Sequence, residues 1–234
     1  MEIIKAAERH FSDFGWLQTY WLFSFSNFYD PQNVQLGALR VFNDDIVKPD
    51  GGFATHPHEE MEIITIVLQG EITHEDSMGN KTVIRAGDVQ RMSAGTGLTH
   101  SEHNFAKEEV FFYQIWIFPD IAGLEPTYAQ KTYDASQWQN RLLPVASGQD
   151  IPGAVTFHTD ATIYRCQLAM GKEVIHDCAE GRCVFLYLTE GSLSVNGQEV
   201  AARDQVRFKT AEHLVIKAQE LSDFMLIDVP ARTE

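Results

Sequence analysis

The stretch Thr55-His56-Pro57-His58-Glu59-Glu60-Met61-Glu62 places two histidines two residues apart and runs directly into the apolar segment 62–68. Side chains at positions i and i+2 of a β-strand share a face, so His56 and His58 lie about 6.6 Å apart along the backbone and can converge on one ion. Glu62 is expected to share that parity. The pattern predicts a strand that carries a metal site.

A second pair with the same spacing, His100 and Glu102, follows the glycine-rich turn at residues 94–97. A lone His-x-His pair is more often a surface or structural feature than a metal site. Two pairs on neighbouring strands of one barrel would bring three imidazoles and a carboxylate to a common centre, which is the ligand set of a transition-metal ion. The second pair therefore favours the metal.

The rest of the chain is rich in short strand-like segments and poor in helical periodicity. Runs of β-branched and aromatic residues cover 62–68, 81–84, 110–118, 184–188, 192–195, 214–218 and 224–229. The turn sequences at 77–80 and 196–197 lie between such runs, as hairpin turns with positive φ would. Many short strands at this spacing predict an all-β sandwich or barrel.

Two halves of the chain share one layout. Residues 68–92 and 188–208 each have a glycine after a strand, a hairpin with asparagine and glycine at its tip, and an aspartate that leads into another strand. Between the halves, residues 137–141 are typical of a short helix or turn, and Pro144, Gly148 and Pro152 of a linker. We infer two similar β domains, at residues 1–135 and 153–234, joined by a linker at 136–152.

Composition excludes several classes of function. The chain has 33 acidic and 18 basic residues, a net charge of −15, and no basic patch, so it would be repelled by nucleic acids and anionic membranes. No run approaches the ~18 apolar residues that cross a bilayer, and the first residues lack a leader pattern, so a cytoplasmic location is expected. The three cysteines, Cys166, Cys178 and Cys183, are expected to be reduced core residues.

The motifs around both histidine pairs resemble the cupin superfamily and, within it, the pirin family, which includes bacterial quercetinase-like proteins. The cupin-like positions are Gly51, His56, His58, Glu62 and Gly70, then Gly87, Gly95, His100 and Asn104. The pirin-like segments are FSFSNFYDP (23–31), LRVFNDD (39–45), THPHEEMEI (55–63), DSMGN (76–80), GDVQRMSAGTGLTHSEHN (87–104) and YQIWI (113–117). Ser93 replaces the usual cupin proline, and the gap from Gly95 to His100 is longer; both departures are similar to pirins. The resemblance is densest over residues 13–135 and implies a bicupin, two tandem jelly-roll barrels.

The resemblance also implies the ligand set. General cupins use the glutamate at Glu62, whereas pirins use the one at Glu102, so His56, His58, His100 and Glu102 are the expected ligands. Glu62 is the reserve ligand, or else a buried acceptor that supports one. Fe(II) is the metal that the resemblance favours, and Mn, Co, Ni, Cu and Zn also suit nitrogen and oxygen ligands. His74 and His103 are left outside this site.

The second half has no His-x-His pair, and a site drawn from His176, Cys178, Cys183 and His213 lacks a matching second pair. The C-terminal domain is therefore expected to hold no metal.

Aromatic residues of the first half, which are more often core residues, could also line a flavonoid-sized pocket. They are Phe23, Phe25, Phe28, Tyr29, Phe111, Phe112, Tyr113 and Trp116.

The expected function is a metal-dependent dioxygenase that cleaves flavonols such as quercetin with O₂ and releases carbon monoxide and a depside, with Glu102 as proton acceptor. The alternative is a pirin-like regulatory protein, a transcriptional cofactor or redox-responsive partner of a basic protein, with flavonol cleavage as a side activity. A metal-assisted isomerase or hydrolase is a third hypothesis, because the fold does not determine the function. The chain is expected to be a monomer that contacts neither nucleic acid nor membrane.

Overall fold

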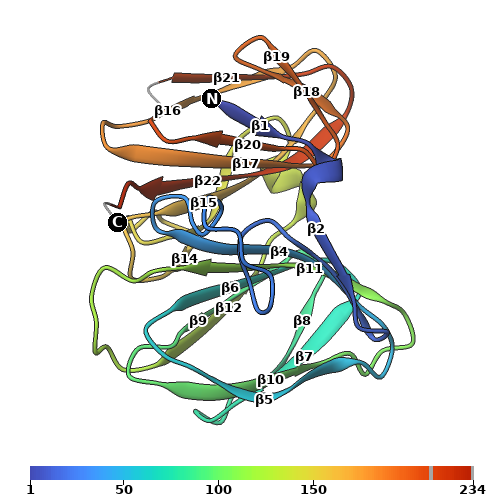
Figure 1. Cartoon of the computed structure of the whole chain (residues 1–234), viewed down its shortest axis with the longest axis vertical. Coiled ribbons are helices and arrows are strands. Elements are labelled where there is room, and N and C mark those ends of the chain that lie inside the picture. Colours follow the sequence, from blue (N-terminus) through green and yellow to red (C-terminus); the bar gives the residue numbers. More distant parts are fainter. Residues whose placement is uncertain (211–212, 233–234) are drawn as a thin grey trace.

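The computed structural model describes residues 1–210 and 213–232, which form two β-barrels stacked along the long axis of the molecule (Figure 1). Each barrel combines a seven-stranded and a four-stranded sheet. The repetition of this arrangement confirms the all-β fold with two tandem domains. No described helix is long and apolar enough to span a membrane.

The N-terminal barrel closes its large sheet against a smaller one that carries the histidine motifs. The large sheet has the order β12-β9-β6-β11-β4-β3-β2 and the small one β5-β10-β7-β8. Their bounds are β2 (His10–Asp13), β3 (Leu17–Trp21), β4 (Leu39–Val47), β5 (Gly52–His58), β6 (Glu62–Gln69), β7 (Glu71–Asp76), β8 (Lys81–Arg85), β9 (Asp88–Ser93), β10 (Leu98–His103), β11 (Val110–Ile117) and β12 (Thr127–Thr132).

The C-terminal barrel repeats this plan, with a large sheet β1-β20-β17-β22-β15-β13-β14 and a small sheet β16-β21-β18-β19. The bounds are β1 (Glu2–Ile4), β13 (Leu143–Ser147), β14 (Val155–Thr156), β15 (Thr162–Leu168), β16 (Glu173–Asp177), β17 (Arg182–Glu190), β18 (Ser192–Val195), β19 (Gln198–Ala201), β20 (Gln205–Phe208), β21 (His213–Ala218) and β22 (Ser222–Pro230). Two 3₁₀ turns, η1 (Ala6–Glu8) and η2 (Ala135–Trp138), precede β2 and β13.

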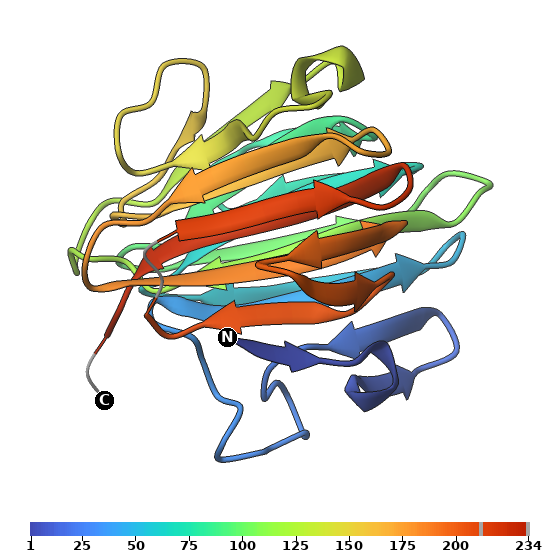
Figure 2. The same cartoon turned by 90° about the horizontal axis from the view of Figure 1, so that it is seen from above.

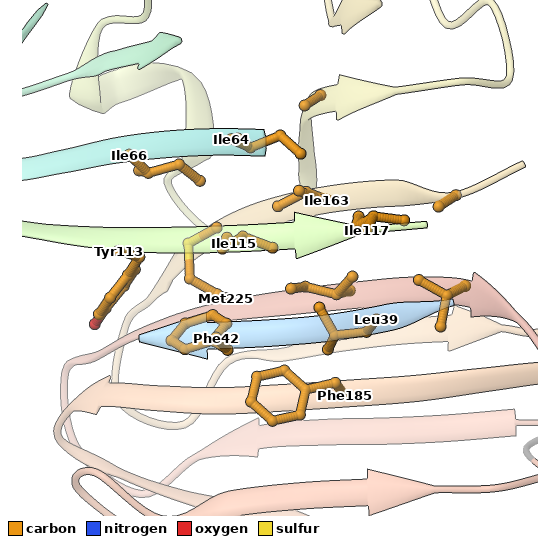
Figure 3. Close-up of a cluster of buried hydrophobic side chains, with 14 of the residues drawn as sticks. Leu39, Phe42, Ile64, Ile66, Tyr113, Ile115, Ile117, Ile163, Phe185 and Met225 are labelled. Atoms are coloured by element: carbon orange, nitrogen blue, oxygen red, sulfur yellow. The ribbon is translucent and has the colours of Figure 1, made fainter. Parts of the chain in front are cut away.

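The two large sheets face each other across one continuous apolar core (Figure 3). Side chains of β4, β6 and β11 meet side chains of β15, β17 and β22, and they include Leu39, Phe42, Ile64, Ile66, Tyr113, Ile115, Ile117, Ile163, Phe185 and Met225. The opposite faces of β4, β6 and β11 line the inside of the N-terminal barrel. Burial on both faces explains why β6 and β11 are nearly continuous apolar runs in the sequence, whereas β4 also carries Asn43, Asp44 and Asp45.

Two strands extend the C-terminal sheet from outside the range expected for that domain. β1 pairs with β20, and Figure 2 shows it at the edge of that sheet. β13, which lies within the expected linker, pairs with β15. The division at residues 135 and 153 stays a prediction, since these pairings show only which sheet the two strands extend.

Candidate metal centre

Three histidines converge inside the N-terminal barrel because β5 and β10 are antiparallel neighbours. His100 of β10 lies opposite His56 of β5, and His58 shares the face of His56. The ring centroids lie 4.4 Å apart for His56 and His100, 4.8 Å for His56 and His58, and 4.9 Å for His58 and His100. One ring nitrogen from each lies within 4.8 Å of those of the other two. The predicted convergence of the three imidazoles is therefore present.

Glu102 lies on the same strand as His100 and is only 1% exposed. Its carboxylate comes within 4.8 Å of a nitrogen of His100 and of His74, and it lines the same cavity as His56 and His58. Gln114 donates a hydrogen bond from Nε2 to Glu102 Oε2 at 3.0 Å, and Thr65 Oγ1 lies 3.4 Å from Oε1. The carboxylate is thus held in place by β11 and β6 and adjoins the imidazole group.

The donor set fits a divalent transition metal. Both ring nitrogens of His100 are buried without a hydrogen-bond partner among the described residues, and such orphaned atoms are costly unless a ligand satisfies them. Burial, together with the neighbouring imidazoles, lowers the pKa of His58 to about 4 and that of His100 to about 2. Both rings are therefore neutral near pH 7, which is the form that binds metals.

The reserve ligand Glu62 points away from this centre. A left-handed residue, Glu60 at φ 48°, separates β5 from β6, so the strand parity expected from His58 to Glu62 is wrong. Glu62 lies on the face of β6 opposite Thr65 and accepts a hydrogen bond of 2.6 Å from Ser93 Oγ. Glu62 lies at the boundary between the two barrels, where its buried carboxylate acts as a hydrogen-bond acceptor.

His74, which the sequence analysis left outside the site, lies beside His100. It is completely buried, its ring centroid is 5.4 Å from that of His100, and it stacks on Tyr128. Nε2 of His74 lies 3.0 Å from Asp76 Oδ2, and Asp76 also accepts backbone hydrogen bonds from Met78 and Asn80. Because an ionised carboxylate only accepts, His74 donates from Nε2 and keeps a lone pair on Nδ1. The spacing of His74 and Asp76 was the signal available in the sequence.

His103 lies outside the group, as its parity predicts. Its side chain belongs to the opposite face of β10 from His100 and Glu102, and its ring packs on Phe105 with centroids 4.4 Å apart.

A cavity of about 530 Å³ opens beside the imidazoles. His58 meets Trp116 edge to face at 4.9 Å, and Trp116 meets Phe25 in the same way at 5.3 Å. The aromatic lining consists of Phe14, Trp16, Trp21, Phe25, Phe53 and Trp116, and the polar lining includes Ser26, Asn43, Asp45, Glu102 and Gln114. A cavity of this size with few polar groups is typical of a small-molecule site.

Only two of the predicted pocket aromatics, Phe25 and Trp116, line this cavity. Phe23 and Tyr113 belong to the core between the barrels, and Phe112 to the core inside the N-terminal barrel. Tyr29 is exposed. Most of the wall was not predicted from the sequence, because residues 17–21 were not recognised as a strand. The alternation along β3 places Leu17 and Trp21 on one face.

Asp45 is the other buried carboxyl group of the cavity. Burial raises its pKa to about 8, and the nearby charges of Asp44 and Glu102 act in the same direction. Asp45 is therefore largely protonated near pH 7, in contrast to an ordinary surface aspartate.

The C-terminal barrel brings His176, Cys178 and Asp228 within 4.8 Å of one another. Asp228 already accepts from Arg182 Nε at 2.6 Å and lies 2.8 Å from His176 Nε2. His213 instead pairs with the exposed Asp177. The positive charge of the Arg182 guanidinium beside Asp228 disfavours binding of a metal cation at these residues. The expectation that the C-terminal barrel holds no metal stays a prediction.

Models of known protein families match parts of both barrels. The Pirin family model matches residues 4–117, and the model of the quercetinase C-terminal cupin domain matches residues 144–229. A quercetin 2,3-dioxygenase of Escherichia coli (strain K12) is 40% identical, with 97% of each chain covered. A pirin-like protein of Caulobacter vibrioides is 39% identical over 93% of this chain and 94% of its own.

Two solved structures share the whole fold. The crystal structure of YhhW from Escherichia coli has a TM-score of 0.94 at 38% identity and covers 100% of this chain and 99% of its own. The crystal structure of bacterial pirin YhhW in complex with nickel(II) has a TM-score of 0.93 at 37% identity, with 99% of each chain covered. A relative with this architecture therefore binds a divalent transition metal.

Proposed function

The chain belongs to the pirin family, and from this membership we propose that it is a quercetin 2,3-dioxygenase-like enzyme that cleaves flavonols with O₂ at a metal ion in its N-terminal barrel. The observation that carries the proposal is the group of His56, His58, His100 and Glu102 at the wall of an aromatic cavity of about 530 Å³. The name of the Escherichia coli relative supports flavonols as the substrate class.

We assign His56, His58, His100 and Glu102 as the ligands and Fe(II) as the native ion. The nickel(II) complex of the relative supports a divalent transition metal in general, and Mn, Co, Cu and Zn suit the same donors. A divalent ion bound there would act as a Lewis acid that stabilises the anion of a substrate hydroxyl group.

Glu102 is the group that accepts the hydroxyl proton. Burial raises its pKa to about 7 in the absence of a metal ion, and a bound cation would lower this pKa, so Glu102 can take the proton once its bond to the ion loosens on substrate binding. Oε2 is occupied by the Gln114 amide, whereas Oε1 has only the longer contact with Thr65. Oε1 is therefore the less strongly hydrogen-bonded of the two oxygens.

The aromatic walls hold the flat substrate and keep water away from the reacting ring. Trp21, Phe25 and Trp116 form a chain of edge-to-face contacts with centroids 5.6 and 5.3 Å apart. Such rings offer apolar surfaces for a flavonol, and exclusion of water strengthens every electrostatic interaction in the cavity.

The proposed reaction consumes O₂ and releases carbon monoxide and a depside. The protein is proposed to act as a cytoplasmic monomer.

Carbon monoxide release from quercetin tests this proposal. The protein is stripped of metal, reloaded anaerobically with each candidate ion and assayed under air. We expect release with one or two of the metals and its loss in His56→Ala. The matched control is His213→Ala, which removes a surface histidine paired with Asp177 in the other barrel.

The opposite result would favour the regulatory alternative. If no ion supports release although one divalent ion still binds per chain, flavonol cleavage is not the function of the site. The search then moves to a protein partner whose affinity changes with the oxidation state of the metal.

A further inference from the structure

The cavity has a polar strip on β4 that the proposed chemistry does not use. Asn43 and Asp45 are two residues apart, both line the cavity, and each is only 3% exposed. Within the part of the chain that the structure describes, Oδ1 of each has no hydrogen-bond partner. Buried polar atoms are nearly always satisfied, so two unpaired atoms at a cavity wall point to hydrogen-bonding partners inside the cavity, supplied by water or by a bound molecule.

The residues that face these two side chains leave both Oδ1 atoms without a hydrogen bond. Asn43 lies opposite Gln114, whose amide is already engaged with Glu102 and Thr65. Asp45 lies opposite Thr19, whose hydroxyl is near enough to lower the pKa of the Asp45 carboxyl group, although Thr19 Oγ1 and Asp45 Oδ1 make no hydrogen bond of good geometry.

The neighbouring positions on the inward face of β4, Val41 and Val47, are apolar and fully buried. A barrel interior built for packing alone would be apolar at positions 43 and 45 as well, because an unpaired buried polar group costs free energy.

We propose that Asn43 and Asp45 form a hydroxyl-recognition subsite, which selects flavonols that carry further hydroxyl groups on their rings besides the one presented to the metal centre. This subsite rests on the proposed function, and it recognises the additional hydroxyl groups of the substrate. It makes Asn43 and Asp45 specificity-determining residues.

The position of the strip suits this role. Neighbouring strands lie about 4.8 Å apart, so Asn43 is one strand away from Gln114, the residue that holds Glu102. A ligand of flavonol size that reaches Glu102 with one hydroxyl group therefore extends over β4. The carboxyl of Asp45 and the amide of Asn43 each combine a donor and an acceptor when neutral, as a hydroxyl group does. Burial raises the pKa of Asp45 to about 8 and so favours its neutral form.

Binding measurements without turnover test the subsite separately from catalysis. The probes are quercetin and 3-hydroxyflavone, which has no other hydroxyl group, and the protein is loaded with Zn(II), which is redox-inactive. Tryptophan fluorescence reports binding, since three of the four tryptophans, at positions 16, 21 and 116, line the cavity. Calorimetry checks the same constants. We expect the wild-type protein to bind quercetin at least about tenfold more tightly than 3-hydroxyflavone.

The variants Asn43→Leu and Asp45→Leu replace each polar side chain with an apolar one of similar length. Each is expected to weaken quercetin binding about tenfold and to change 3-hydroxyflavone binding less than about twofold. The thermal midpoint should stay equal or rise, because an unsatisfied polar group is removed. Asp45→Asn should retain most of the selectivity. His213→Ala, which removes a surface histidine of the other barrel, is the control and should leave the selectivity unchanged.

Two outcomes overturn the subsite alone: equal affinities of the wild-type protein for both flavonols, or variants that weaken both ligands by the same factor. The first needs no variant and holds even if a substitution impairs folding. Binding of neither flavonol to the wild-type protein is a different failure, since it rejects the proposed function and the subsite together.

Discussion

Glu102 is the residue on which the proposed chemistry and the metal affinity both depend. Burial raises its pKa to about 7, while the hydrogen bonds from Thr65 and Gln114 act in the opposite direction. A carboxyl group must lose its proton to bind a cation. Metal binding and proton release are therefore linked at this residue.

The first prediction concerns the pH dependence of metal affinity. Below about pH 7 Glu102 is protonated in the metal-free protein, so the metal dissociation constant should rise as pH falls, by up to about tenfold per unit. His58 and His100 have pKa values of about 4 and 2 and add no step near neutrality. Titrations between about pH 6 and pH 8 in buffers of different ionisation enthalpy measure the affinity and the protons released.

The control for this prediction is Glu102→Gln, whose amide cannot titrate. Its metal affinity should be weaker and should lose the part of the pH dependence due to residue 102. A pH profile identical to that of the wild-type protein would show that another group releases the proton.

A second prediction for the same variant concerns turnover. Glu102→Gln keeps the size of the side chain and a carbonyl oxygen that can accept from Gln114, so the barrel should fold. Loss of a general base typically lowers the rate at least about 100-fold. Steady-state quercetin consumption at saturating metal measures the effect, and an unchanged rate would remove Glu102 from proton transfer.

His74 is predicted to act on the metal only through its neighbour. Its Nε2 lies 3.0 Å from Asp76 Oδ2, and its ring adjoins that of His100. Loss of such a supporting group typically weakens metal affinity by about 10- to 100-fold. His74→Phe should therefore bind metal about tenfold more weakly while one ion still binds per chain, as measured by competition with a chelator. An unchanged affinity would reduce His74 to a packing residue.

At the residue scale, sequence reasoning succeeds where one strand carries both partners of a pair. The phases of His56 with His58, and of His100 with Glu102, follow from strand periodicity alone. It fails for Glu62, because the left-handed residue Glu60 resets the parity between β5 and β6. The spacing of His74 and Asp76 indicates that the two share a face, but the position of His74 beside His100 depends on the pairing of β7 with β10.

At the scale of elements, the pairing of β5 with β10 positions the site through an irregularity. The register shifts between His100, opposite His56, and Glu102, opposite Phe53. Gly52 permits the two strands to approach closely at this point. A Cβ there would lie 2.5 Å from the carbonyl oxygen of Glu102 and would overlap the ring of His103.

Gly52→Ala is therefore predicted to push β5 away from β10. Steric overlap with backbone atoms should lower the free energy of unfolding by about 1–3 kcal/mol and weaken metal binding, because His56 and His58 move with β5. Chemical denaturation and metal titration measure the two effects. Gly79→Ala, at a turn with open space around the Cβ but a left-handed φ of 90°, is a comparison that should lose stability without losing metal affinity.

Strands and hairpins were the elements best predicted from the sequence. The asparagine–glycine turn at 196–197 has the two positive φ values, 48° and 81°, that its residues favour. The walls of the cavity were not predictable in the same way. β2 and β3 are short and mixed in polarity, and they become part of the large sheet only by pairing with β4, so their burial is a tertiary effect.

At the scale of the whole molecule, the two barrels are joined by polar contacts as well as by the apolar core. Asp44 of β4 accepts hydrogen bonds from Tyr187 at 2.7 Å and from Arg203 at 2.8 Å, and Arg9 lies within 3.4 Å of the same oxygen. Three separate parts of the chain thus meet one buried carboxylate, next in sequence to Asp45 of the cavity.

We predict that the barrels unfold as one unit. Phe185 of the C-terminal barrel is fully buried against Phe23 and Phe42 of the N-terminal one, so Phe185→Ala should cost about 3–5 kcal/mol. Unfolding followed by tryptophan fluorescence, which reports mainly on the N-terminal barrel, should coincide with unfolding followed by circular dichroism. Two separated transitions would show that the barrels are thermodynamically independent.

We propose that one divalent ion binds in the N-terminal barrel between three histidines and Glu102. Anomalous X-ray diffraction from metal-loaded crystals, recorded on both sides of the absorption edge of the ion, tests it most directly. We predict one anomalous peak per chain, within bonding distance of His56, His58, His100 and Glu102. A peak at His176, Cys178 and Asp228, or none beside Glu102, would contradict the claim.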